Sequence, residues 1–263
     1  NYISYVKSKL ILFHKILKIN GTAIINSRLK NYKSLLKKLQ TRNIKVITFG
    51  SKDVFFTNEK NLNLSVFKKN YKIKNLKKNK VQKENLECAI SCALAMGISI
   101  IKILNSLNKL KAAPGRFEII SYKKKTSSII IDYAHTPEAL KTLLKSYTQN
   151  KVKPSIVFGC GGNRDKSKRK KMAIIVKKYA KNIYITDDNP RNENPEIIRK
   201  TLKKYCPKGL EISDRKKAIK IAISKIKKNE ILIIAGKGHE KYQIIKNKKI
   251  KFDDYKIAKS FIK

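Results

Sequence analysis

Apolar positions recur along this chain at two different spacings, and the two spacings alternate from one end to the other. Short β-branched runs, typical of buried strands, are followed by stretches whose apolar residues keep a helical period. In the first half this pattern predicts strands at 22–26 and 45–49, with a helix between them that extends through Leu39. Such alternation predicts an α/β fold built on a mostly parallel sheet.

The rest of the first half is less regular. Segment 84–96 is apolar at helical spacing, which predicts a buried helix that ends at Gly97. A second helix is expected at 98–107. Residues 71–83 contain many Lys and Asn with little periodicity, so we expect a loop or an irregular ribbon there.

The pattern is interrupted at Pro114-Gly115, and we place a domain boundary there, between residues 1–113 and 114–263. The downstream half alternates more clearly. Its predicted strands lie at 128–132, 154–159, 182–186 and 231–235, and its predicted helices lie at about 137–148, 167–180, 195–205 and 214–227. This order predicts a Rossmann-like domain.

Charged or glycine-rich residues follow each of the four downstream strands. The carboxyl ends of parallel strands meet at one edge of a sheet, where ligands of such folds bind. We therefore expect these loops to form one site. The loops read Asp132-Tyr-Ala-His-Thr-Pro137, Gly159-Cys-Gly-Gly-Asn-Arg-Asp165, Asp187-Asp-Asn-Pro-Arg191 and Gly236-Lys-Gly-His-Glu240.

The composition first suggests a different function, because the 263 residues have a formal net charge of +45. Such a balance is typical of nucleic-acid or anionic-membrane binding. The excess is nearly all Lys, is spread over the whole chain and accompanies many Ile and Asn, which is the expected trace of an AT-rich genome. A basic nucleic-acid-binding protein therefore stays only an alternative.

Cellular location and cysteine chemistry also follow from the sequence. No apolar run approaches the roughly 20 residues of a membrane span, and the first residues do not resemble a signal peptide, so we expect a cytoplasmic protein. Cys88 and Cys92 lie four residues apart in a predicted helix. With no Cys or His pair to complete a zinc site, we expect both to pack in the core.

The loops at 186–191 and 235–240 carry groups that suit a small zwitterion. Arg191 can hold a carboxylate through two parallel hydrogen bonds. Asp188 and Glu240 can each hold an ammonium group. The chemistry predicts an amino-acid site, and we expect Arg164 in the glycine-rich loop to meet a carboxylate as well.

Several residues allow a structural interpretation beside a functional one. The run 159–167 is not a phosphate loop, since Asp165 stands where that motif needs Gly, and it can be a glycine turn that leads into a helix. His135 can be structural or catalytic, and His239 can orient its own loop. Asp253-Asp254 precede the final helix, where capping is the expected role.

Five motifs occur in the order seen in the Mur ligase family, and the chain most resembles the family's diaminopimelate-adding type. They are Pro114-Gly-Arg-Phe-Glu118, Asp132-Tyr-Ala-His-Thr-Pro-Glu138, Phe158-Gly-Cys-Gly-Gly-Asn-Arg-Asp165, Thr186-Asp-Asp-Asn-Pro-Arg191 and Ala235-Gly-Lys-Gly-His-Glu240. Tyr5-Val-Lys-Ser-Lys9 resembles the segment with the family's carbamylated lysine. Asn26 matches a family Asn that acidic residues follow, whereas Ser27-Arg28 follow here.

This resemblance implies an ATP- and Mg²⁺-dependent amide ligase of peptidoglycan biosynthesis. It would join meso-diaminopimelate to UDP-MurNAc-L-Ala-D-Glu through an acyl phosphate. Arg116, Asp132 and His135 would contact ATP, and Lys9, as a carbamate, would bind the metal. The amino acid would be held by Arg164, Asp188, Asn189, Pro190, Arg191, Gly236 and Glu240.

The chain departs from the family in lacking a G-x-x-x-x-G-K-[ST] phosphate loop and a His/Glu metal cluster before Lys9. The resemblance therefore implies the C-terminal part of a longer, monomeric enzyme. Residues 1–113 would be the last part of the central ATPase domain, unstable alone because a sheet edge is exposed. Residues 114–263 would be the amino-acid-binding domain and fold independently. A related ligase that adds another amino acid is the remaining alternative.

Overall fold

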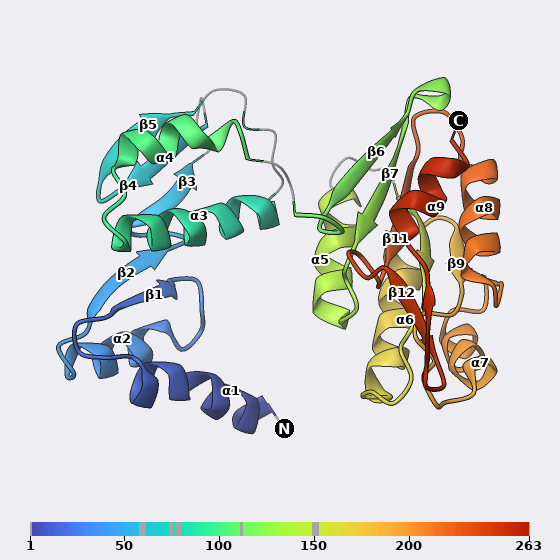
Figure 1. Ribbon diagram of the computed structural model, residues 1–263, viewed down its shortest axis with the longest axis horizontal. Coiled ribbons are helices and arrows are strands. Elements are labelled where there is room, and N and C mark those ends of the chain that lie inside the picture. Colours follow the sequence, from blue (N-terminus) through green and yellow to red (C-terminus); the bar gives the residue numbers. More distant parts are fainter. Residues whose placement is uncertain are drawn as a thin grey trace. The chain divides into compact units, whose positions relative to one another are not determined.

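The computed structural model describes residues 2–57, 62–73, 76, 80–110, 113–148 and 153–262. The chain divides into two compact units, residues 1–110 and 111–263, which are described separately (Figure 1). Both units layer helices on a sheet, so the predicted α/β fold is confirmed. Across the described residues, no helix has both the length and the apolar character needed to span a membrane.

The first unit contains a five-stranded sheet in the order β1-β2-β3-β4-β5. Strands β1 (Thr22–Asn26) and β2 (Lys45–Phe49) are parallel and agree with the sequence prediction. The sequence did not predict strands β3 (Val54–Thr57), β4 (Asn63–Val66) and β5 (Lys69–Lys72). β3 is parallel to β2 and antiparallel to β4, and β4 is antiparallel to β5. The apolar run of β3 is only three residues long, and polar residues interrupt β4 and β5, so none shows the longer apolar run that marks a buried parallel strand.

Helices pack against this sheet. They are α1 (Tyr2–Ile11), the π-helix η1 (Leu12–Ile16), α2 (Tyr32–Gln40), α3 (Lys80–Ala95) and α4 (Ile100–Leu107). Helix α3 starts inside the predicted loop at 71–83, which also includes the end of β5. Residues 74–75 and 77–79 of that predicted loop lie outside the described residues.

The helix predicted at 84–96 is present within α3, but it is buried on one face only, and the expectation that Cys92 packs in the core was wrong. Glu87, Ile90 and Ser91 are buried, whereas Cys92 is exposed and Cys88 is only half-buried. One face of α3 packs on the sheet with Ile47 and Leu64, and the opposite face is open. Because several residues of this segment are small or apolar on more than one side of the helix, the sequence pattern does not show which face is covered.

The second unit is built on a six-stranded sheet in the order β10-β9-β8-β11-β7-β6. The four predicted strands are β7 (Ser127–Asp132), β8 (Ser155–Phe158), β9 (Ile183–Ile185) and β11 (Ile231–Ala235), and all four are parallel neighbours. The sequence missed β6 (Glu118–Tyr122), which is antiparallel to β7, and the short β10 (Leu210–Glu211). A 3₁₀ turn, η2 (Lys123–Lys125), joins β6 to β7.

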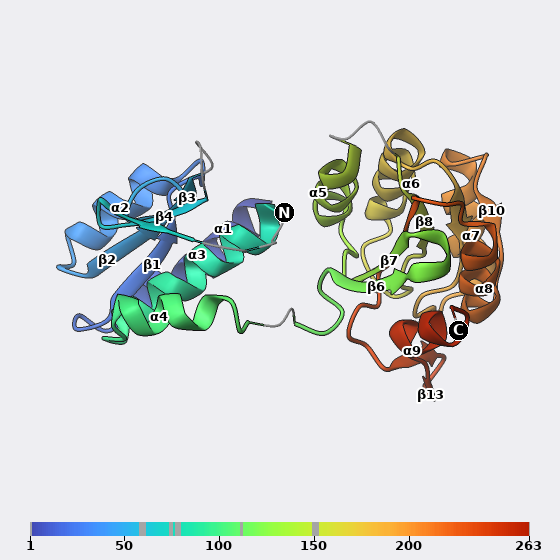
Figure 2. The same cartoon turned by 90° about the horizontal axis from the view of Figure 1, so that it is seen from above.

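Helices cover both faces of this sheet (Figures 1 and 2). Helices α5 (Pro137–Thr148), α6 (Ser167–Tyr179) and α7 (Pro195–Tyr205) share one core with Ile130 and Ile233. Helices α8 (Arg215–Lys225) and α9 (Asp254–Ser260) share the other core with Ile129 and Ile131. Successive strand residues point to opposite faces, so these apolar strands are buried on both sides.

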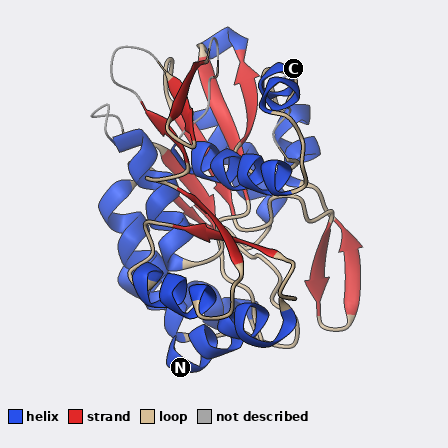
Figure 3. Ribbon diagram, turned by 90° about the vertical axis from the view of Figure 1, so that its left-hand side faces the viewer, coloured by secondary structure: helices blue, strands red, loops and turns tan. Residues whose placement is uncertain are grey.

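A separate antiparallel hairpin, β12 (Tyr242–Ile245) and β13 (Lys248–Lys251), forms a two-stranded sheet of its own (Figure 3). The hairpin follows the Gly236–Glu240 loop and precedes α9. Its strands are mostly Lys and Ile, and no Gly or Pro lies between them, so the sequence did not predict this hairpin. It lies against the candidate site.

Candidate functional site

A cavity of about 570 Å³ opens at the carboxyl ends of β7, β8, β9 and β11. Side chains from all four predicted loops line it, together with the first turn of α6. Of the predicted site residues, seven line this cavity: His135, Arg164, Asp188, Asn189, Arg191, Gly236 and Glu240. The expected convergence of the four loops is therefore present in the structure.

The glycines at 159–162 allow two loops to approach closely. A Cβ atom at Gly159 would lie 2.2 Å from the Thr186 carbonyl oxygen, and one at Gly162 would lie 1.9 Å from that of Pro190. The amide of Gly162 donates to the Asn189 carbonyl oxygen at 2.9 Å. The run is thus a glycine turn that leads into α6, and its glycines serve loop packing.

The loop at 188–191 is held by β12. The Arg191 amide donates to the Ile244 carbonyl, and the Lys246 amide donates to the Arg191 carbonyl, at 3.0 and 2.7 Å. The Gln243 side chain donates to the Asp188 carbonyl at 2.6 Å. These bonds fix Arg191 at a φ of +51°, a value unusual for a residue with a side chain.

The guanidinium of Arg191 faces the cavity and is partly occupied. Its Nη1 donates to the carbonyl oxygens of Gly162 at 2.9 Å and Asn189 at 3.4 Å. Within the described part of the chain, Nη2 and Nε make no hydrogen bond. A half-buried guanidinium held in this way is a preorganised carboxylate binder.

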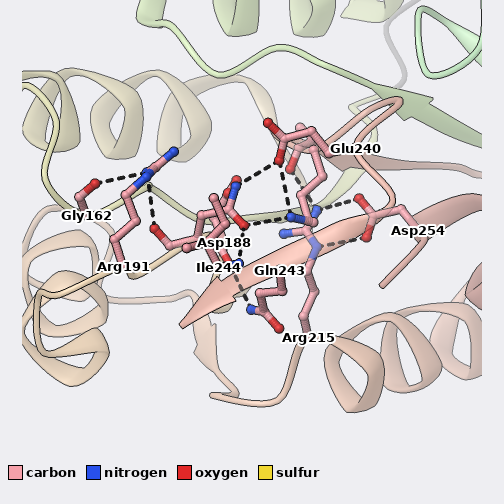
Figure 4. A network of polar contacts seen from close by, with 11 residues as sticks. Gly162, Asp188, Arg191, Arg215, Glu240, Gln243, Ile244 and Asp254 are labelled. Carbon is pink, nitrogen blue, oxygen red and sulfur yellow. Dashed lines mark hydrogen bonds and ion pairs between the residues drawn. The ribbon is translucent and has the colours of Figure 1, made fainter. Parts of the chain in front are cut away.

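A polar network that includes Glu240 and Ile244 lies beside the cavity (Figure 4). The hydrogen bonds of this network meet at Asn189. Its Oδ1 accepts from Lys237 Nζ and from the Ile244 amide, both at 2.9 Å, and its Nδ2 donates to Glu240 Oε2 at 2.8 Å. Lys237 Nζ also contacts Glu240 Oε2 at 3.3 Å. The amide of Asn189 therefore links the two loops.

A buried ion pair lies next to this network. Arg215 and Asp254 are both fully buried and form two hydrogen bonds of 2.8 Å, from Nε and from Nη2. Nη2 also donates to the Ala235 carbonyl at the end of β11. Asp253 caps α9 as expected, whereas the capping role expected for Asp254 was wrong, because its carboxylate holds Arg215.

The Asp188 side chain is a carboxylate on the cavity wall that makes no hydrogen bond to other described residues. Only 7% of the surface of Asp188 is exposed. A Cβ atom at Gly236 would lie 2.6 Å from Asp188 Oδ2, so glycine is needed there, at a φ of +116°. The arrangement leaves Asp188 free to accept from an ammonium group.

Asp132 and Arg116 lie at the edge of the site rather than in the cavity. Asp132 accepts hydrogen bonds from the amides of Phe117 and Ala134, both at 2.8 Å, and burial nevertheless raises its pKa. The Arg116 guanidinium stacks on the Tyr133 ring at 4.5 Å, and that ring also contacts His135. These residues form a stacking surface with a positive charge.

Gly115 packs against the loop at 236–240, and its replacement by alanine gives a testable expectation. A Cβ there would lie 2.0 Å from the His239 amide nitrogen, and its φ is +64°. We expect Gly115→Ala to lower the free energy of unfolding of the second unit by about 2–3 kcal/mol.

Gly97→Ala is the matched control, because Gly97 has a φ of +80° but nothing within 4 Å of a Cβ. It should cost about 1 kcal/mol in the first unit. Denaturant unfolding followed by hydrogen exchange measures each unit separately. Equal losses for the two variants would contradict the close packing of Gly115.

Two further predicted residues, Pro190 and Lys9, do not line the cavity. Pro190 is buried in the loop that carries Arg191. Arg164, by contrast, lines the cavity and is exposed. Lys9 lies on α1 of the first unit, exposed, with its Nζ 5.5 Å from the centre of the Tyr5 ring. Among the described residues no group of three His, Cys, Asp or Glu side chains could hold a metal ion.

Sequence reasoning missed four residues that shape the site: Tyr133, Lys237, Arg215 and Gln243. Tyr133 and Lys237 lie inside two of the five motifs, next to residues that were predicted to form the site. Their position beside those residues was a usable signal. Nothing in the sequence marked Arg215 among the many basic residues of this chain. Gln243 lies on a hairpin that was not predicted.

The chain is similar in sequence to known proteins. Residues 115–238 match the family described as Mur ligase, glutamate ligase domain. The chain is 39% identical to the UDP-N-acetylmuramoyl-L-alanyl-D-glutamate--2,6-diaminopimelate ligase of Rickettsia conorii (strain ATCC VR-613 / Malish 7). The matched region covers 99% of this chain and 56% of the relative. The enzyme of the same name from Anaplasma marginale (strain St. Maries) is 36% identical over 95% of this chain and 54% of the relative.

Solved structures are also similar to this chain. A diaminopimelate ligase structure of the same name has a TM-score of 0.58 and 30% identity, over 100% of this chain and 56% of that chain. MurF from Acinetobacter baumannii shares the fold at a TM-score of 0.70 and 14% identity, over 100% of this chain and 56% of that chain. The chain thus spans about half the length of the curated relatives it matches.

Proposed function

Because this chain belongs to the Mur ligase family, we propose that it carries the amino-acid-binding part of an ATP-dependent ligase. The ligase would join meso-diaminopimelate to UDP-MurNAc-L-Ala-D-Glu in peptidoglycan synthesis. Residues 111–263 would bind the amino acid, and residues 1–110 would be part of the central ATPase domain. ATP and a UDP-linked substrate are found in the cytoplasm, where we expect the enzyme to act.

The observation that supports this proposal most is the charge pattern of the cavity wall. Asp188 and Glu240 present carboxylates from two loops, and Arg191 presents a guanidinium whose Nη2 and Nε bond to none of the described residues. Meso-diaminopimelate carries an ammonium and a carboxylate at each end, so it can use all three groups. Lysine lacks the second carboxylate and would leave Arg191 without its partner.

The chemistry would follow from positioning rather than from a nucleophile on this chain. The D-glutamate carboxyl would be activated as an acyl phosphate, with ATP supplying the phosphoryl group, and the amine would displace that phosphate. Asp188 and Glu240 would hold one end of the amino acid so that the other end reaches the acyl carbon. Arg116 and Tyr133 together offer a positive charge and an aromatic ring, which a nucleotide could use.

The described residues fit the metal less well. Lys9 has no cluster of carboxylate or imidazole ligands beside it within the described chain, so no step is assigned to a metal here. We keep Lys9 as the proposed carbamate position because its segment resembles that of the family.

Isothermal titration calorimetry tests the proposal directly. The 263-residue chain should bind meso-diaminopimelate and should bind L-lysine at least about 100-fold more weakly, since a site built for a polar group rejects an analogue without it. An amino-acid-dependent ligation assay on a full-length enzyme that contains these residues extends the test to turnover. Equal affinity and equal turnover for the two amino acids would rule out the proposed specificity.

A further inference from the structure

Lys237 is a fully buried lysine to which the proposed function assigns no role. Its side chain has 0% exposure and does not line the cavity. Nζ donates to Asn189 Oδ1 at 2.9 Å and contacts Glu240 Oε2 at 3.3 Å. A lysine is rarely buried completely unless it is paired, so these two partners account for its charge.

The burial of this ammonium is unfavourable by itself. Burial lowers the pKa of Lys237 below its ordinary value of 10.5, although the carboxylates of Asp188, Glu240 and Asp254 oppose that shift and Arg215 adds to it. These groups come from the loop after β9, from the loop of Lys237 itself, and from α9 and α8. An apolar side chain of similar size would avoid this cost, so stability alone does not explain a lysine here.

The ammonium determines how its two partners are oriented. Asn189 Oδ1 accepts two donors, Lys237 Nζ and the Ile244 amide, which places its Nδ2 toward Glu240. Glu240 Oε2 in turn accepts from Asn189 and Lys237. Within the described residues Oε1 accepts no hydrogen bond, so that oxygen is available to a ligand.

We propose that Lys237 is a positioning residue, which sets the orientation of Asn189 and Glu240 so that Glu240 can accept from the ammonium of the bound amino acid. The proposal rests on the proposed function for its ligand. Lys237 itself does not contact that ligand, because it is enclosed behind the two side chains that it orients. Lys237 therefore affects the affinity and specificity of amino-acid binding and takes no part in forming the amide bond.

Lys237→Met tests this role, because methionine is unbranched and of similar length but has no charge. Lys241→Met is the control: Lys241 is an exposed lysine of the same loop, so the change in net charge is identical. Circular dichroism and a thermal scan first establish that both variants fold. The Asn189 side-chain amide signal in a ¹H–¹⁵N spectrum, assigned by its loss in Asn189→Ala, then reports the network without any ligand.

We expect Lys237→Met to shift or broaden the Asn189 signal and Lys241→Met to leave it unchanged. In calorimetry Lys237→Met should weaken meso-diaminopimelate binding by about tenfold or more, the usual cost of losing one charge-assisted contact that orients a ligand group. Lys241→Met should bind as the wild type does. An unchanged Asn189 signal in Lys237→Met would overturn the proposal, and so would unchanged affinity.

The pH profile separates an electrostatic role from a merely structural one. As the pH rises through the lowered pKa of Lys237, its ammonium becomes a neutral amine and loses its hold on Glu240. The affinity ratio of wild type to Lys237→Met should therefore shrink toward one as the pH approaches 10.5, whereas deprotonation of the ligand's own amine affects both proteins equally. A ratio that stays constant with pH would contradict the proposal.

The two proposals can fail separately. If the wild type does not bind meso-diaminopimelate, the proposed function is refuted. The Asn189 signal then decides the role of Lys237 alone: a shift in Lys237→Met supports orientation by the ammonium, and no shift overturns it.

Discussion

Arg191→Ala is expected to weaken binding of meso-diaminopimelate by roughly 10²–10³-fold while changing L-lysine affinity by less than about tenfold. The physical reason is that two nitrogens of Arg191 bond to nothing in the described part of the chain and can meet a carboxylate. Of the two amino acids, only diaminopimelate has a second carboxylate to bind them. The loss of discrimination should thus come almost entirely from the correct ligand. Calorimetry with both amino acids measures it.

Two further variants make this result specific. Arg191→Lys keeps the positive charge but not the planar fork, so it should restore only part of the affinity. Lys248→Ala removes an exposed charge from the nearby hairpin and should change neither affinity. If Arg191→Ala weakened both amino acids equally, the residue would hold the loop in place rather than select the ligand.

Breaking the buried ion pair is expected to give the largest loss of stability. Asp254→Ala leaves the Arg215 guanidinium fully buried without its carboxylate. Arg215 Nη1 already has no hydrogen-bond partner among the residues that the structure describes. We expect a loss of about 3–5 kcal/mol in the free energy of unfolding of the second unit. For a unit of this size that corresponds to a melting temperature lower by roughly 10 °C.

The double variant Arg215→Met/Asp254→Leu is the matched comparison. It removes both charges and fills the space with apolar atoms, so it should be more stable than Asp254→Ala. Hydrogen exchange of the β11 amides reports this region, because Arg215 is bonded to the Ala235 carbonyl at the end of β11. A double variant as unstable as the single one would show that the pair stabilises the fold through its charge interaction.

In both units the sequence predicted most of the parallel strands and the helices between them, and it missed the antiparallel strands and the short edge strand β10. Strands β7, β8, β9 and β11 are apolar runs buried on both faces, and helices α5 and α7 each begin at a proline. These are strong local signals. Strands β3 to β5 and the hairpin β12–β13 are antiparallel and partly exposed, so their side chains vary with their neighbours rather than with the strand itself.

The same distinction applies to the site. Convergence of the loops with Asp188, Arg191 and Glu240 follows from the rule that parallel strands end at one edge, and the structure brings these residues to one cavity. The rule does not say which side chain faces the cavity and which lies behind it. Asn189 was predicted to contact the amino acid, and both ends of its amide are engaged with Lys237, Ile244 and Glu240.

The sequence by itself determined the α/β class, the parallel strands β7, β8, β9 and β11 with helices α5 to α8, and the chemistry of the loops, because these depend on residue types at fixed spacing along the chain. Only the tertiary structure decided which charges are buried and with whom they pair. Arg215 and Asp254 are 39 residues apart, and Lys237 and Asn189 are 48 apart. Among so many lysines, a buried and paired cation differs from a solvated one only through the neighbours that the fold supplies.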